Sequence, residues 1–428
     1  MLAIIVALSI VALLPVIFVW PHIGILAWYW IGLMNPHRLI WGVLENQRYA
    51  ALIGAATLGA WFLSREAKRI PAGPTTLLLG LLLVWITITT AFAHMPEPAW
   101  PAWEKAFKIL LITFATIALI NTRERVHALV WMVVICLGFY GVKGGVFTLL
   151  SGGQFHVFGP PRSFISDNNQ LALALIMTLP FIVYLYGQTA HPLVRAGLLV
   201  TALACFFSII GSQSRGAFLA LCAMGLFLVL KSRHKLQIGA VAVVLAVTLV
   251  NFVPQEWVER MESIRAYESD GSALSRLYAW RFAYEVALEN PMTGGGFNVH
   301  YDEDYYFRLS PEADSNFNFH SVYFEVLGEQ GFVGLFIFGA LLFATWRTFS
   351  STIRLAGTHP NTQWAAQLSR MGQVSLVGYC SAGAFLNMAF YDLIYLIIAF
   401  APIAQGVALA ELRPRTARVY RRQPAPDG

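Results

Sequence analysis

The stretch LALALIMTLPFIVYLY, from Leu171 to Tyr186, contains no charged residue. A helix rises 1.5 Å per residue, so an apolar stretch of about twenty residues can cross a hydrocarbon core about 30 Å thick. Similar stretches recur along the whole chain, in which 57% of the residues are hydrophobic and 12% are charged. Backbone groups in lipid must be satisfied within their own segment, so these stretches must form helices. The sequence therefore predicts an all-α integral membrane protein.

Basic residues cluster in short segments between pairs of apolar stretches, for example at Arg123 and Arg125. The formal net charge is +6, but its dispersed distribution does not predict a nucleic-acid partner. By the positive-inside rule, the basic segments and the arginine-rich tail are cytoplasmic. The four cysteines lie in apolar stretches without CxxC spacing, so neither a disulfide nor a metal framework is expected.

This pattern predicts the order of the membrane spans. Ten spans are expected at Thr76 to Ala93, Ala106 to Ile120, Ala128 to Leu150, Leu171 to Tyr186, Gly197 to Ile210, Ala217 to Leu230, Ile238 to Val253, His320 to Trp346, Met371 to Phe390 and Leu393 to Ala410. Three more apolar runs precede Arg65, and the first of them does not read as a cleaved signal peptide. An even number of spans must cross if both termini are cytoplasmic, so we expect about twelve.

The chain then divides into four parts: transmembrane helices over 1–253, a large loop over 254–319, further transmembrane helices over 320–411 and a basic tail over 412–428. The loop holds twelve of the 23 acidic residues and no lysine, and its flanking spans place it outside the cytoplasm. Within it, Ser272 to Glu289 is predicted to be an amphipathic helix near the interface. Its apolar positions are Leu274, Leu277, Tyr278, Phe282, Val286 and Leu288. The acidic residues near His300 form either a divalent-cation site or a solvated loop.

Three arginines occupy positions suited to an anionic ligand. Arg162 and Arg215 stand at predicted exits from the membrane, and Arg276 opens the predicted loop helix. The planar guanidinium fork binds phosphate bidentately, so several together would clamp a diphosphate. The alternative for each is that it reaches lipid head groups. Arg215 is distinguished because it lies in a tight turn on the side where the positive-inside rule disfavours a basic residue.

Lys143 and His320 are the other ionisable candidates. Lys143 lies inside an apolar span between glycines that would let backbone or ligand approach, although a lysine can also extend to the interface. His320 begins the span after the loop, and an imidazole titrating near neutrality can take a proton from an acceptor hydroxyl. A hydrogen-bonded interface histidine is the alternative. Glu325 and Glu329 follow on about the same helical face and could orient His320 or relay its proton.

Several of these strings resemble those of the O-antigen ligase and polymerase superfamily of bacterial membrane glycosyltransferases. They are Ser-Arg-Gly at 214–216, Ser-Arg and Trp within 275–280, Asn-Pro-x-x-Gly-x-Gly at 290–296, and the His320 helix that ends in Glu329-Gln-Gly. The family usually has Asn where this chain has Ser321. Upstream, Met34-Asn-Pro-His-Arg, Gly141-Val-Lys-Gly-Gly and Gly159-Pro-Pro-Arg-Ser-Phe resemble the branch of O-glycosylation ligases associated with exosortase systems.

The resemblance implies a GT-C-type fold with short helices in a periplasmic loop. It further implies an enzyme of the bacterial inner membrane that acts in lipopolysaccharide biosynthesis without metal or cofactor. The donor would be a glycan on undecaprenyl diphosphate, and the acceptor a lipid A-core or related hydroxyl. The family's diphosphate-binding arginines correspond to Arg215 and Arg276, with Arg162, and its essential histidine to His320. We expect Lys143 to join the diphosphate site and Glu325 and Tyr278 to support it.

Three other functions fit the same features. A polymerase would use a second lipid-linked repeat as acceptor, and a protein O-glycosylation ligase would use a protein. A transporter or flippase for lipid-linked glycans also needs many spans, but it predicts ionisable residues and broken helices near the bilayer midplane. The candidates here gather at one predicted surface beside a large loop, which favours chemistry at the interface.

Overall fold

A computed structural model describes residues 2–39, 47–66, 68, 70–231 and 271–412. Within these ranges the chain is helical and contains no strand. The α-helices are α1 (Leu2–Val19), α2 (Pro21–Tyr29), α3 (Tyr49–Leu63), α4 (Pro74–Ala91), α5 (Pro96–Leu119), α6 (Arg123–Leu150), α7 (Asn168–Gln188), α8 (Pro192–Gly211), α9 (Arg215–Lys231), α12 (Gly271–Glu289), α13 (Glu303–Leu309), α14 (Val322–Ala356), α15 (Gln363–Ala382) and α16 (Asp392–Leu412). Short turns join them at η1 (Trp30–Met34), η2 (Pro36–Leu39), η4 (Val299–Tyr301), η5 (Pro360–Thr362) and η6 (Gly383–Phe385).

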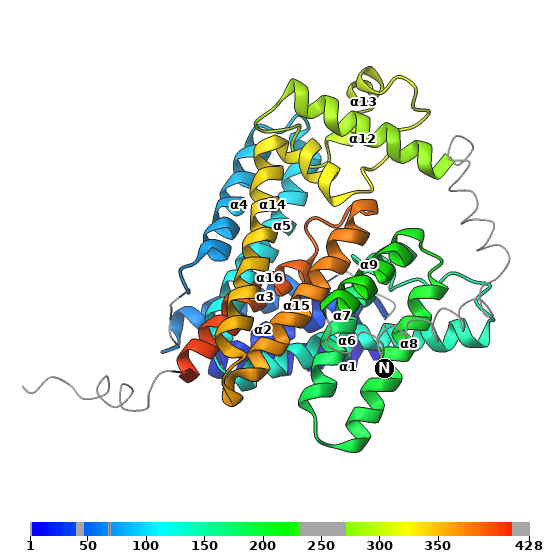
Figure 1. Ribbon diagram of the computed structural model, residues 1–428. Helices are drawn as coiled ribbons and strands as arrows, with labels where there is room; N and C mark the ends of the chain where they lie inside the picture. The colour runs from blue at the N-terminus through cyan, green and yellow to red at the C-terminus, as the bar shows by residue number, and fades with distance from the viewer. Residues whose placement is uncertain (1, 40–46, 67, 69, 232–270, 413–428) are drawn as a thin grey trace, which may run out of the picture.

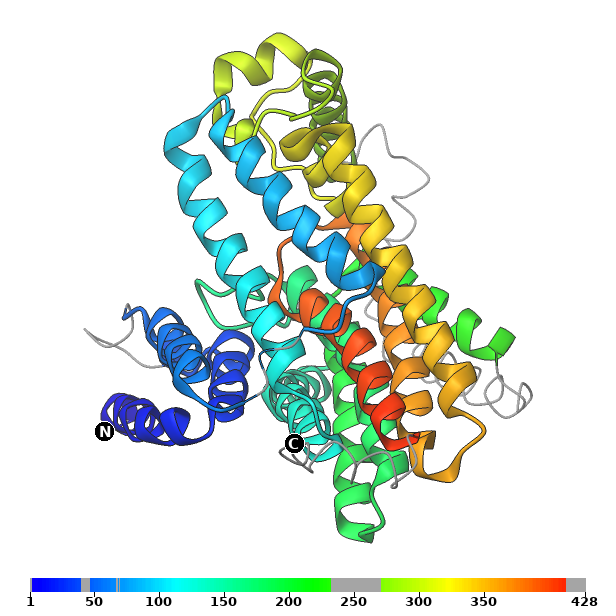
Figure 2. The same ribbon diagram turned by 90° about the vertical axis from the view of Figure 1, so that its left-hand side faces the viewer.

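Helices α4, α5 and α14 stand side by side, and α12 and α13 lie across one end of them (Figure 1). The first three helices form a group at the side of the bundle, and α1 lies near the end opposite to α12 and α13 (Figure 2). Helix α16 runs through the centre and is buried along nearly its whole length. The central helices therefore bury each other, while α12 and α13 make a separate cap.

Six helices in the described ranges are long and apolar enough to cross a membrane. They are α4, α6, α7, α8, α14 and α16. The apolar segments Ile4–Val19 and Tyr49–Leu63 are shorter. The predicted span from Ile238 to Val253 lies outside the described residues, as do 254–270 of the loop and 413–428 of the tail. The expectation of about twelve spans with a GT-C-type arrangement thus stays a prediction.

One predicted span ends earlier than expected. The prediction ran from Met371 to Phe390, but α15 ends at Ala382 and residues 386–391 are not helical. Side chains satisfy this irregular backbone inside the protein, as non-helical segments at membrane depth require. The hydroxyl of Tyr379 donates to the carbonyl of Met388 at 3.0 Å, and that of Tyr395 to the carbonyl of Ala389 at 3.1 Å.

The predicted span from His320 to Trp346 is a longer helix with a break. Helix α14 is interrupted at Gly331, which has φ 70° and ψ −175°. The turn of residues 290–296 closes against this break. The amides of Gly295 and Gly296 donate to the carbonyls of Gly328 and Glu329 at 2.8 and 3.0 Å, and the amide of Phe332 donates to the carbonyl of Pro291 at 2.9 Å. We call residues 290–296 and 328–332 the glycine junction.

Helix α4 completes the glycine junction. The indole of Trp85 donates to the backbone carbonyl of Gln330 at 3.0 Å, and the hydroxyl of Thr89 donates to the side-chain carbonyl oxygen of Gln330. The amide of Asn298 donates to the carboxylate of Glu329 at 2.9 Å. Because its amides are engaged with α14, the glycine-rich turn reverses the chain and does not present a nest for a phosphate.

The predicted loop helix is confirmed as α12, but its buried face differs from the expected one. The buried positions are Ala279, Phe282, Ala283, Val286 and Ala287. Leu277 and Leu288, expected on the apolar face, are exposed. The difference arises because alanines fill the close contacts beneath the helix, where Phe282 stacks on Tyr306 at 4.3 Å between ring centroids.

Candidate functional site

His320 lies in the last connection before α14, with a left-handed backbone (φ 47°) and a half-buried side chain. Helix α12 holds this segment in place through Trp280. The indole of Trp280 donates to the carbonyl of Phe319 at 2.9 Å, and its ring stacks on Phe324 with centroids 4.9 Å apart. A non-glycine residue with positive φ is strained, and such strain is concentrated at functional sites. The backbone therefore holds the imidazole in one defined place.

Two charged residues act on this imidazole. Burial lowers the pKa of His320, the charge of Arg276 lowers it further, and the carboxylate of Asp167 opposes both. Arg276 lies four residues before Trp280, which is one turn earlier on α12. The arginine of the loop helix, the histidine and an aspartate before α7 are thus neighbours. A lowered pKa keeps His320 neutral, and so able to accept a proton, at neutral pH.

A second histidine, His300, is buried close by. Burial, with a smaller contribution from His320, lowers the pKa of His300 to about 4. Its ring contacts Phe319 at 5.3 Å between centroids. His300 is therefore neutral under ordinary conditions and belongs to the packing under α12.

Asp167 was not among the site residues predicted from the sequence. Its carboxylate accepts from the amide of Asn169 at 2.9 Å and, with Gln170, forms a capping box at the start of α7. The pattern Asp-x-x-Gln before an apolar run is a helix-start signal visible in the sequence. That signal locates the aspartate at a helix end, but its proximity to His320 comes only from the fold.

Arg162 belongs to the same connection as Asp167. It is exposed and has a left-handed backbone, φ 58°. The turn around it is closed by the hydroxyl of Ser163, which donates to the carbonyl of Pro160 at 2.7 Å and accepts from the amide of Ile165 at 3.2 Å. Its guanidinium is thus displayed from an ordered turn.

Arg215 is the first residue of α9, after the predicted turn from Gly211. Ser214 caps this helix by accepting from the amide of Ala217 at 3.2 Å. The turn is joined to the Arg162 connection, because Asn168 donates to the carbonyl of Ser212 at 2.7 Å. Gln213, within the turn, also has positive φ, 53°. Helix N-termini attract anions, which adds to the charge of Arg215.

Turn η6, which follows α15 in the chain, packs against the start of α9 and against the start of α14. A Cβ placed on Gly216 would lie 3.2 Å from that of Phe385, and one on Gly383 would lie 3.1 Å from the side chain of Val322. Val322 follows His320 by two residues. The segments that carry Arg215 and His320 therefore pack against opposite ends of one short turn.

The remaining predicted residues lie elsewhere. Lys143 is on the exposed face of α6, and the glycines beside it serve helix packing: a Cβ on Gly144 would lie 2.2 Å from the hydroxyl of Ser208 on α8. Tyr278 of α12 packs against the apolar cluster beneath that helix, and its carbonyl accepts from the hydroxyl of Ser310 at 3.4 Å. Glu325 accepts from the amide of Ala389 at 3.1 Å, which ties α14 to the irregular segment before α16.

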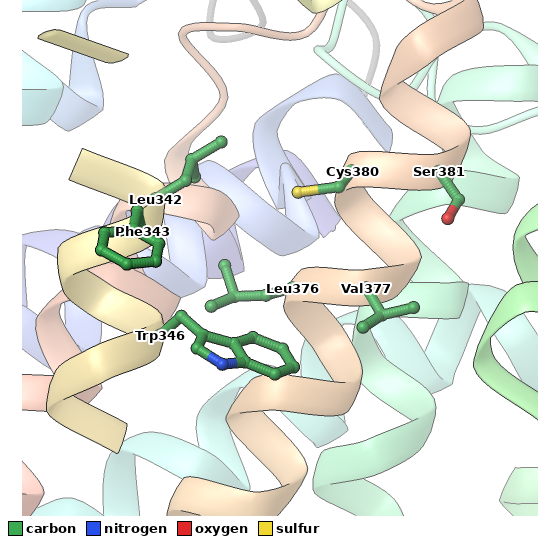
Figure 3. Close-up of a pocket in the computed structure, with 7 residues that line it drawn as sticks. All are labelled: Leu342, Phe343, Trp346, Leu376, Val377, Cys380 and Ser381. Carbon is green, nitrogen blue, oxygen red and sulfur yellow. The ribbon is translucent and has the colours of Figure 1, made fainter. Parts of the chain in front are cut away.

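An apolar pocket of about 300 Å³ lies between α14 and α15 (Figure 3). It is lined by Leu342, Phe343, Trp346, Leu376, Val377, Cys380 and Ser381. The carbonyl of Cys380 accepts from the hydroxyl of Tyr323 at 2.8 Å. One end of the pocket is therefore linked to a residue three positions after His320, while Phe343 on its wall is 65% exposed.

One of the acidic residues near His300, Asp302, has structural partners. Asp302 caps α13 by accepting from the amide of Tyr305 at 2.9 Å, and it pairs with His94 at 3.0 Å. Over the part of the chain that the structure describes, no group of three or more histidine, cysteine or acidic residues is placed to hold a metal ion.

The described residues form a helical chain with six candidate membrane spans, in which Arg276 and Asp167 lie near the half-buried imidazole of His320. Residues 200–339 match the family model described as O-antigen ligase, and this match supports the resemblance to the O-antigen ligase superfamily. Arg215, Arg276 and His320 lie within the matched residues. Residues 1–190, which hold Arg162 and Asp167, match a family of unknown function (DUF5935). No curated protein matched the chain.

Proposed function

We propose that this chain transfers a glycan from undecaprenyl diphosphate to a hydroxyl of lipid A-core or a related acceptor, at the periplasmic face of the bacterial inner membrane. The observation that carries the proposal is that Arg276 and Asp167 both lie close enough to His320 for their charges to act on its imidazole. A neutral imidazole beside a guanidinium can accept the proton of a hydroxyl while the cation holds the leaving group. The O-antigen ligase match, which includes Arg276 and His320, supports a function of this general class.

The proposed reaction is one displacement with inversion. The acceptor oxygen forms a bond to the anomeric carbon, and the bond from that carbon to the diphosphate oxygen breaks. The diphosphate leaves with the electron pair, and His320 takes the acceptor proton. Arg276, Arg215 and Arg162 would stabilise the charge that develops on the diphosphate, so we propose that transfer needs no metal.

The pocket between α14 and α15 suits the isoprenoid chain of the donor. Its lining is apolar, and its link through Cys380 and Tyr323 leads toward His320. A lipid-linked donor needs such a path because its diphosphate and its hydrocarbon chain have opposite preferences for water. We therefore place the chain along α14 and the diphosphate among the arginines.

The test is transfer by the purified protein in proteoliposomes that contain undecaprenyl-diphosphate glycan. The Arg276→Lys variant is expected to lose most activity, because a point charge cannot replace the bidentate fork. Arg281→Lys is the matched control on the same helix: Arg281 pairs with Glu312 at 2.6 Å on the exposed side, and its replacement should leave the rate unchanged. Addition of EDTA should also leave the rate unchanged. Equal rates for Arg276→Lys and wild type would overturn the diphosphate assignment.

The choice of acceptor separates the alternatives. Lipid A-core that gains one glycan supports the ligase, a ladder of lengthening lipid-linked repeats indicates a polymerase, and a modified protein indicates a protein O-glycosylation ligase. Movement of donor across the bilayer without any new glycosidic bond would replace the proposal with a flippase.

A further inference from the structure

Lys105 of α5 makes a contact that links it to the candidate site. Its ammonium lies 3.4 Å from the centroid of the Phe164 ring, within the range of a cation–π interaction. Phe164 is part of the connection that carries Arg162 two residues before it and Asp167 three residues after it. The lysine therefore holds the ring at the middle of that connection.

Two acidic residues act on the charge of Lys105. They are Asp392 at the start of α16 and Glu325 on α14, and both attract the ammonium. Asp392 is fixed by the indole of Trp28, which donates to it at 3.3 Å, and Glu325 by the amide of Ala389 at 3.1 Å. Lys105 thus lies where α5, α14, α16 and the Arg162 connection meet.

Lys105 has an exposed side chain, but its partners differ from those of its neighbour Lys108. Lys108 lies one turn later on α5 and pairs with Glu104 on the same exposed helix face, an arrangement that contributes little. Lys105 instead reaches an aromatic ring and carboxylates from three other segments. These partners on other segments make Lys105 a candidate for positioning the Arg162 connection.

We propose that Lys105 is a positioning residue for the glycan transfer: by holding Phe164 it fixes Arg162 and Asp167 relative to His320. The inference rests on the proposed function for its effect on catalysis. Lys105 itself touches no reacting atom. Its role is to keep the Arg162 connection in the one arrangement in which Asp167 faces the imidazole.

Transfer kinetics test the effect on catalysis. Lys105→Met should lower kcat about tenfold, Lys105→Arg should restore most of it because a guanidinium also stacks on an aromatic ring, and Lys108→Met should match wild type. The acidic limb of the pH profile should move to lower pH in Lys105→Met, because Asp167 would no longer favour the imidazolium while Arg276 and His300 still face it. Wild-type kinetics and an unmoved limb in Lys105→Met would overturn the proposal.

A double-mutant cycle identifies the partner. Phe164→Leu should lower kcat to a similar extent, and the double variant with Lys105→Met should be no worse than either alone. Additive losses would show that Lys105 acts through another group.

Hydrogen exchange separates this inference from the proposed function, because it requires no transfer. Amides of residues 159–167 should exchange faster in Lys105→Met than in wild type, with no change in Lys108→Met. Unchanged protection there rules out the positioning role even if the protein transfers glycan. If exchange is faster in Lys105→Met but the wild-type protein transfers no glycan to any acceptor, the positioning contact is supported and the proposed function is refuted.

Discussion

The glycine junction and the rim of the candidate site both contain irregular backbone, but different residue types adopt it. The rim comprises Arg162, Gln213, Arg215, Arg276 and His320. At the glycine junction, positive φ falls on Gly294, Gly296 and Gly331, and the backbone amides end on carbonyls of the facing segment. At the rim, positive φ falls on Arg162, Gln213 and His320. Both regions carry strings that resemble family motifs, yet one motif builds the frame and the other presents charged and titratable side chains.

The largest effect is expected at the rim. His320→Gln should lower the rate of transfer by about 10²–10⁴-fold, the usual contribution of a general base, while donor binding persists. The initial rate in proteoliposomes measures it. His359→Gln, at an exposed position between α14 and α15, should behave as wild type. A His320→Gln enzyme at the wild-type rate would assign the base to another group.

The next effect is expected at the glycine junction, where the loss is one of folding. A Cβ on Gly331 would lie 2.2 Å from the carbonyl oxygen of Met292, at φ 70°. Gly331→Ala should therefore destabilise by about 1–3 kcal/mol from backbone strain, with more from the clash. Thermal unfolding in detergent measures it. Gly339→Ala on the same helix, where nothing lies within 4 Å, is the control and should not lower the midpoint. Equal midpoints for the two variants would contradict the role given to the break.

A smaller effect connects the two regions through α12. Trp280→Phe removes the donor to Phe319 but keeps an aromatic ring against Phe324. The loss of one neutral hydrogen bond should cost about 1 kcal/mol. We expect kcat to fall a few-fold because the His320 connection becomes less rigid. The midpoint temperature of thermal unfolding should fall only slightly. If kcat is unchanged, the indole has no part in placing His320.

The smallest expected effect is a shift in pH dependence. The carboxylate of Asp167 raises the pKa of His320 against burial and Arg276, so Asp167→Asn should lower that pKa further. The base then stays neutral to lower pH, and the acidic limb of kcat/KM should move to lower pH. Asparagine also caps helices, so α7 should keep its start. A limb that moves upward, or does not move, would show that Asp167 does not face the imidazole in the working enzyme.

The sequence predicted what depends on local pattern. Helical class, α12 and the segments of Arg215 and His320 follow from apolar periodicity and from short motifs. The interruption at Gly331 was missed because a hydropathy average covers many residues, and a single glycine has little effect on it. Asp167 and Lys105 were missed because their importance comes from partners far away in the chain, such as His320 and Asp392. Lys143 was predicted as a site residue partly because glycines flank it. The fold shows that the glycines following it pack closely against α8.

The sideways position of the pocket along α14 has a consequence for supply of the donor. If the donor enters there as proposed, it need not leave the leaflet, and its encounters are governed by two-dimensional diffusion and by its mole fraction among the surrounding lipids. Turnover of such an enzyme should follow surface dilution of the donor by inert phospholipid, and not the volume in which the vesicles are suspended.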